Sequence, residues 1–239
     1  MTEKHCEKVL IIGGSSGIGL ATARLAAEKG YEVIIAGRNV EKLQSAKQSI
    51  AKPIKTIPMD MLDQESIRVV FETLGKIDHL VIAASEITFG DVRTLSVDSA
   101  KASFDSKFFG PYRLVQVALD YLNKTGSITL FSGSAGAKPE MSTEVISAIN
   151  AAVEGFGRGL AVSYTPLRVN AVSPGLIDTP IYDTFDPAVK DQFFNQFTQT
   201  LKIPRAGKAE EVAEAVLFLM GNGYTTGITL FVDGGHRLS

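Results

Sequence analysis

The sequence predicts an α/β fold, in which one parallel sheet is covered by helices on both faces. Short apolar runs rich in strand-forming residues alternate along the chain with longer segments of helical periodicity. Such alternation is typical of parallel strands joined by helical crossovers. Hydrophobic residues make up 45% of the 239 residues, which is enough for a sizeable core. Because no linker-like stretch divides the chain, we expect residues 1–239 to form a single domain.

The expected elements follow one another in a regular order, from a first strand that runs directly into a glycine-rich turn. The strands are Val9–Ile12, Glu32–Ala36, Ile54–Met59, His79–Ala83, Ser127–Phe131, Arg168–Val172 and Thr229–Val232. The helices are Gly17–Lys29, Val40–Ala51, Gln64–Leu74, Ser99–Leu122, Val145–Ser163 and Ala209–Met220. About seven strands with crossovers of this kind imply a doubly wound sheet.

One segment, Pro180–Pro204, interrupts this rhythm. It places Phe185, Phe193, Phe194 and Phe197 among polar residues, so it fits a mobile helical flap better than a core element. The aromatic rings suggest a hydrophobic ligand. The same rings can instead serve to pack the flap onto the rest of the protein.

The overall charge gives no case for a nucleic-acid or membrane partner. The 24 basic and 26 acidic residues leave a formal net charge of -2. The longest apolar runs, such as Ala215–Met220, are far shorter than the ~20 residues of a membrane span, and Met1–Lys8 is too polar for a signal sequence. We therefore expect a soluble, cytoplasmic protein. The lone Cys6 excludes an internal disulfide and a cysteine-built metal site.

A phosphate-binding turn is predicted after the first strand. A strand, a glycine turn and a helix N-terminus together direct backbone N–H groups at an anionic pyrophosphate, within the positive end of the helix dipole. A glycine cluster alone can be a tight turn, but its place after the first strand favours a cofactor loop. The expected contacts are Gly13, Ser15, Ser16, Gly17, Ile18 and Gly19.

The end of the second strand predicts which dinucleotide binds. An acidic residue there would hold the ribose 2′-hydroxyl of NAD, but this chain has Arg38 and Asn39. A guanidinium pairs with a 2′-phosphate, so we expect NADP(H). The alternative is a solvated arginine at a strand end. Asp60 and Met61 end the third strand, where an adenine edge can lie, although a helix-capping aspartate would look the same.

With these residues in hand, the chain resembles the short-chain dehydrogenase/reductase family from about Lys8 to Gly235. The resemblance rests on the glycine turn, on the segment Arg168–Gly175, on Thr179, and on Val232-Asp233-Gly234-Gly235. It implies a Rossmann-type doubly wound fold. It also implies that Pro174 and Gly175 pass beside the nicotinamide, and that Ile177 and Thr179 hold that end of the cofactor.

The chain departs from the family pattern on the catalytic side. The usual Asn-Asn-Ala-Gly turn reads Ile82-Ala83-Ala84-Ser85, which still lets a cofactor pass beside Ala83 and Ala84. Alignment of this segment and of the helices implies that the four relay positions, normally asparagine, serine, tyrosine and lysine, hold Lys107, Gly133, Ile146 and Asn150.

Several residues are candidates to compensate. Ser132 and Ser134 flank the aligned serine position, but in an extended segment their side chains point to the opposite face. Lys107 can place an ammonium near the ribose, where Asn150 can still hydrogen-bond, or can extend to solvent.

Other candidate acids and bases are weaker. Glu140 and Glu144 lie in the expected loop before the helix of Ile146, where Glu144 better serves the helix dipole. His5, His79 and His236 are scattered, so no metal or nucleophilic constellation is predicted.

Three functions follow from these residues. The first is an NADP(H)-dependent oxidoreductase that reduces a hydrophobic acceptor needing little proton donation, because losing a general acid costs roughly 10²–10⁴-fold in rate. The second is an inactive NADP(H)-binding sensor or partner subunit. The third, an ordinary carbonyl reductase, requires Tyr112, Tyr164 or Tyr182 to enter the site, and none has a lysine four residues later.

The family resemblance further implies a homodimer or homotetramer that uses the long helices, where Gly155, Gly157 and Gly159 permit close approach.

Overall fold

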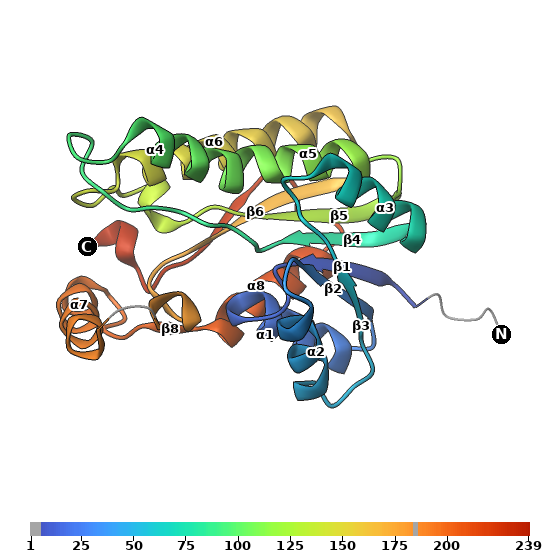
Figure 1. The fold of residues 1–239 in the computed structure, drawn as a ribbon, viewed down its shortest axis with the longest axis horizontal. Helices are drawn as coiled ribbons and strands as arrows, with labels where there is room; N and C mark the ends of the chain where they lie inside the picture. The colour runs from blue at the N-terminus through green and yellow to red at the C-terminus, as the bar shows by residue number, and fades with distance from the viewer. Residues whose placement is uncertain (1–5, 184–185) are drawn as a thin grey trace.

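The fold is known from a computed structural model that describes residues 6–183 and 186–239. Its centre is a seven-stranded sheet in the order β3-β2-β1-β4-β5-β6-β9, and every pair of neighbouring strands is parallel (Figure 1). The strands are β1 Lys8–Ile12, β2 Glu32–Gly37, β3 Lys55–Pro58, β4 Ile77–Ile82, β5 Leu122–Phe131, β6 Arg168–Pro174 and β9 Thr229–Val232. The predicted fold class is confirmed.

Helices cover both faces of this sheet and bury its apolar residues in two separate layers. On one face lie α3 Gln64–Leu74, α4 Val97–Phe104, α5 Gly110–Ala118 and α6 Glu144–Ser163, and on the other lie α1 Gly17–Glu28, α2 Val40–Ser49 and α8 Ala209–Gly221 (Figure 1). The strands are buried on both faces, which explains why they read as continuous apolar runs.

A further helix, α7 Pro187–Thr200, stands apart from the sheet (Figure 1). None of its residues is buried, and it follows the small parallel strand β7 Ile177–Asp178, which pairs with β8 Gly207–Lys208. The expected flap therefore contains a helix. Phe185, which was expected within it, lies outside the described residues.

The expected helix Ser99–Leu122 is confirmed in part. The chain is helical without interruption from Val97 to Ala118, but it contains a π-helical segment, Asp105–Phe109, between α4 and α5, and Leu122 already begins β5. Pro111 is the physical cause, because proline inside a helix removes a donor and clashes with the preceding turn. The Gly110 N–H consequently bonds to the Asp105 carbonyl, which widens the helix and turns Lys107 inward.

The other corrections are small. Glu144 is the first residue of α6 rather than a loop residue, which fits its expected place in the helix's first turn. Helix α6 is also the one described helix that is long and apolar enough to match a membrane span. Its Ile146, Ile149 and Val153 are buried against the sheet, so its apolar face belongs to the core.

Candidate functional site

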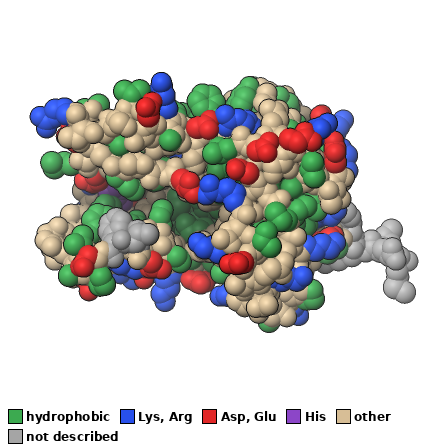
Figure 2. Space-filling view, viewed as in Figure 1, with side chains coloured by type: hydrophobic (Ala, Val, Ile, Leu, Met, Phe, Trp, Pro, Cys, Tyr) green, Lys and Arg blue, Asp and Glu red, His purple; other side chains and the backbone are tan. Residues whose placement is uncertain are grey.

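A groove of about 810 Å³ crosses the carboxyl ends of the strands. It lies next to β1, whose neighbours in the sheet are β2 on one side and β4 on the other. The strand order reverses there, and parallel sheets bind ligands at such a switch point. Figure 2 shows this hollow near the centre of the molecule. Thirteen of the residues expected to contact the cofactor line it: Gly13, Ser15, Ser16, Gly17, Ile18, Gly19, Arg38, Asp60, Met61, Ala83, Ala84, Pro174 and Thr179.

The glycine turn has the shape of a cradle that side chains would fill. Gly13 has φ +80°, and a Cβ there would lie 2.7 Å from the Ala84 backbone nitrogen. A Cβ on Gly19 would lie 2.2 Å from the Gly13 carbonyl oxygen. The Ser16 side chain makes no capping hydrogen bond at the start of α1, and no acidic residue stands in its first turn. The turn therefore leaves the positive end of the helix facing the groove, where a pyrophosphate fits.

Arg38 and Asn39, both expected at the adenosine end of the cofactor, make different contacts. The Arg38 guanidinium lines the groove and forms an ion pair with the Glu86 carboxylate. The Asn39 side chain instead accepts a hydrogen bond from the Lys42 N–H at 2.8 Å and caps α2. Lys42 itself lines the groove, which places a second basic residue near Arg38. Neither Glu86 nor Lys42 was expected from the sequence.

Asp60 does not cap the next helix, because Asp63 is the N-cap of α3. Asp60 lines the groove, while its Oδ1 accepts a hydrogen bond from the Leu62 N–H at 2.9 Å. At the other end, Gly175 and Ile177 lie behind the groove wall. Ile177 is buried in β7, and a Cβ on Gly175 would lie 2.8 Å from the Asp233 Cα.

Lys107 is a charged residue of the groove lining. Its side chain is buried, and its Nζ donates a hydrogen bond to the Ser132 carbonyl oxygen at 2.9 Å. Burial lowers the pKa of Lys107 from 10.5 to about 8. The alternative of a lysine extended into solvent is wrong, because Lys107 is only 9% exposed.

The other three aligned relay positions sit behind the groove. Ile146 packs in the apolar core and Asn150 is 2% exposed. A Cβ on Gly133 would approach the Asn150 Nδ2 to 2.9 Å, so the amide occupies the space beside position 133. The Asn150 Oδ1 is buried without a hydrogen-bond partner among the described residues.

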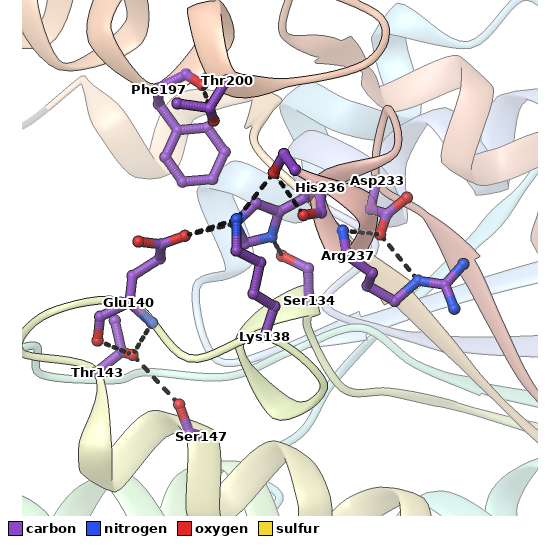
Figure 3. Close-up of polar contacts among 11 residues, drawn as sticks. Ser134, Lys138, Glu140, Thr143, Ser147, Phe197, Thr200, Asp233, His236 and Arg237 are labelled. Atoms are coloured by element: carbon purple, nitrogen blue, oxygen red, sulfur yellow. Dashed lines mark hydrogen bonds and ion pairs between the residues drawn. The ribbon is translucent and has the colours of Figure 1, made fainter.

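The two neighbouring serines differ in where they lie. Ser132 lines the groove, but its nearest polar contact is the Val172 carbonyl at 3.5 Å. The Ser134 hydroxyl contacts the His236 Nδ1 at 3.0 Å, and the His236 Nε2 contacts the Glu140 Oε1 at 2.8 Å (Figure 3). The Ser134 side chain is therefore turned toward the C-terminal segment.

Ser134, His236 and Glu140 form one hydrogen-bonded cluster. The histidine ring is 1% exposed and lies 4.8 Å, centroid to centroid, from the Phe197 ring of α7. The cluster could not be predicted from the sequence, because Glu140 and Ser134 lie 96 and 102 residues from His236. Both ring nitrogens have partners, so the histidine ties the loop after β5 to the C-terminus. No metal-binding cluster is found in the part of the chain that the structure describes.

The aromatic residues of the flap contact one another. The rings of Tyr182 and Phe194 are 5.1 Å apart, and those of Phe193 and Phe197 are 5.9 Å apart. None of the tyrosines that an ordinary carbonyl reductase would need, Tyr112, Tyr164 or Tyr182, lines the groove.

Known proteins are similar to this chain in both sequence and fold. The sequence profile of a family described as Enoyl-(Acyl carrier protein) reductase matches residues 13–237. The short-chain dehydrogenase/reductase ATR9 of Stachybotrys chlorohalonatus is 34% identical over 96% of each chain. A small-chain dehydrogenase solved in complex with NADPH is 32% identical, with a TM-score of 0.86 over 98% of this chain and 100% of that one. The MalC Reductase/Diels-Alderase of Malbranchea aurantiaca is 29% identical, with a TM-score of 0.89 over 98% of this chain and 97% of that one.

Proposed function

The chain belongs to the short-chain dehydrogenase/reductase family, and from that premise we propose that it is an NADP(H)-dependent oxidoreductase with a nonstandard active site. The observation that carries the proposal is the groove itself. It joins a glycine cradle and Arg38 at one end to the buried Lys107 at the other. The acceptor is a small hydrophobic molecule: a quinone, an activated alkene or a carbonyl compound.

The residues present fit NADP(H). The glycine cradle leaves room for a pyrophosphate, and Arg38 and Lys42 offer positive charge for a 2′-phosphate. The orphaned Asn150 Oδ1 would accept a hydrogen bond from a ribose hydroxyl if the side chain turned toward the groove. The related small-chain dehydrogenase was solved with NADPH bound, which supports the same assignment here.

Lys107 takes over the proton-donating role in this proposal. When bound, the cofactor supplies a hydride. At neutral pH an ammonium whose pKa is about 8 is largely protonated and close to the operating pH, which suits a general acid. The Ser132 carbonyl holds the ammonium at the groove wall, and burial excludes bulk water. Ile146, at the aligned tyrosine position, has no proton to donate.

The proposed acceptor class follows from the absence of a tyrosine as proton donor. An activated alkene receives hydride at carbon and needs a proton only afterwards, so it depends less on a well-placed donor than a ketone does. The family description, an enoyl reductase, names substrates of this type and supports the proposal. Pro180 and Ile181, which precede α7, line the groove and give it apolar surface for a hydrophobic acceptor.

The first experiment is a titration with NADPH and NADH, followed by a panel of quinones, enones and ketones with loss of the reduced nicotinamide signal as the readout. We expect NADPH binding and turnover of enones or quinones. Lys107→Gln should lower turnover by about 10²–10⁴-fold and leave the NADPH Kd nearly unchanged. Lys124→Gln, at an exposed lysine near the start of β5, is the matched control. Tight NADPH binding without any turnover would instead identify a sensor or partner subunit.

We also propose that the protein is cytoplasmic and assembles as a homodimer or homotetramer, without a nucleic-acid or membrane partner. A second, apolar hollow of about 750 Å³ supports assembly, because it lies on α4 and its neighbours and includes the exposed Val97 and Phe109. On α6, Gly157 faces the sheet, whereas Gly155 and Gly159 face outward and can approach a partner. Light scattering of the purified protein gives the oligomeric state directly.

A further inference from the structure

The adenosine end of the groove carries a carboxylate as well as a guanidinium. Glu86, in the segment after β4, reaches the Arg38 side chain at the end of β2, and both residues line the groove. Their side chains are 69% and 56% exposed. Strands β2 and β4 flank β1 in the sheet, so the ion pair spans the glycine turn that follows β1. Figure 2 shows acidic and basic side chains meeting above the hollow.

Backbone hydrogen bonds hold the segment that carries Glu86. The Glu86 N–H donates to the Ser106 hydroxyl at 2.7 Å, and the Thr88 N–H donates to the Ser103 hydroxyl at 3.0 Å. Both serines are buried, and Ser106 belongs to the same π-helical segment as Lys107. Two hydrogen bonds therefore hold the segment after β4 against the helical layer, with Glu86 at the rim of the groove.

The two dinucleotides meet this pair differently. The 2′-phosphate of NADPH competes with Glu86 for the Arg38 guanidinium, and it lies close to a carboxylate of the same sign when it pairs with Arg38. NADH instead presents a ribose hydroxyl in that region. A carboxylate accepts a hydrogen bond from such a hydroxyl, as acidic residues at the end of β2 do in NAD-binding sheets. Here the carboxylate comes from the segment after β4.

We propose that Glu86 is a specificity-determining residue, which weakens NADPH binding, strengthens NADH binding and thereby lets the site use both dinucleotides. This inference rests on the proposed function, because it concerns the cofactor of that same site. The exposed ion pair opens readily, since exposed pairs contribute little stability. Arg38 is thus available to NADPH, at a reduced affinity.

The test compares the NADPH and NADH dissociation constants of the wild type and Glu86→Gln at fixed ionic strength. The substitution removes the charge and keeps the shape of the side chain. We expect the NADPH Kd to fall about tenfold, and the NADH Kd to rise severalfold as the acceptor is weakened. The matched control is Glu72→Gln, on an exposed carboxylate of α3 outside the groove, and it should change neither constant by more than about twofold.

Each outcome decides a separate question. A ratio of the two constants that stays the same in Glu86→Gln, while the wild type binds NADPH, would overturn the inference and leave the proposed function standing. Binding of neither nucleotide by a folded wild type would overturn the proposed function and the inference with it. If Glu86→Gln unfolds, Glu86→Asp provides the second measurement. Its shorter carboxylate should release Arg38 and also raise the preference for NADPH.

Discussion

At the scale of single residues, Lys107 connects burial, charge and chemistry. Few side chains are as costly to bury as an ammonium, and this one has a single carbonyl partner, that of Ser132, among the described residues. The cost appears as a pKa lowered by desolvation to about 8. A residue held at such a cost beside a groove is a functional candidate for physical reasons.

The same pKa predicts how stability depends on pH. Because the folded pKa of about 8 lies below the unfolded value of 10.5, the unfolded chain binds more protons between these values, so raising the pH favours the folded state. Relative to Lys107→Met, the wild type should gain stability as pH rises from 7 to 10.5, by at most about 3 kcal/mol. Urea unfolding of both proteins at several pH values measures the difference, in which the other titrating groups cancel. A difference that does not vary with pH would mean that Lys107 keeps an ordinary pKa.

At the scale of elements, local patterns were predictable and distant contacts were not. The glycine turn could be predicted because strand, turn and helix follow one another within 13 residues of sequence, from Lys8 to Leu20. The π-helical segment between α4 and α5 was missed because the apolar periodicity continues through Pro111. Only the proline indicates the widened turn. Arg38 was predicted from its place after β2. Glu86 was missed, because its contact with Arg38 joins segments 48 residues apart.

The glycine turn also gives a prediction for one element. Gly19→Ala would place a Cβ 2.2 Å from the Gly13 carbonyl oxygen, so the turn and α1 must separate. We expect a loss of at least about 2 kcal/mol in the free energy of unfolding, and NADPH binding weakened more than tenfold. Gly221→Ala is the matched control, because no neighbouring element lies within 4 Å of the added carbon at the end of α8. That change should leave NADPH binding unchanged and shift the free energy of unfolding by less than about 0.5 kcal/mol. Unimpaired NADPH binding by Gly19→Ala would contradict the cradle.

At the scale of the whole molecule, the groove depends on parts of the chain that meet only after the sheet has formed. The glycine turn comes from the first strand, Lys107 from the middle of the chain, and Thr179 from the segment that leads to α7. The C-terminal segment packs against the loop after β5, outside the residues that line the groove. There Arg237 pairs with Asp233, its guanidinium covers the Phe231 ring at 3.6 Å, and His236 contacts the loop after β5 (Figure 3). A short tail therefore links α7 to the wall that carries Ser132 and Gly133.

His236 is the residue through which this link can be tested. His236→Leu replaces the imidazole with an apolar side chain of similar size, which leaves the buried Ser134 hydroxyl without its partner and removes the contact to Glu140. We expect a loss of about 2 kcal/mol in the free energy of unfolding, and faster hydrogen exchange in α7, whose Phe197 ring rests on the imidazole. Adding Ser134→Ala should restore part of the loss, because it removes the hydroxyl that His236→Leu leaves without a partner. If His236→Leu left both stability and α7 exchange unchanged, the tail would be a passive end of the chain, and α7 would depend only on its own aromatic contacts.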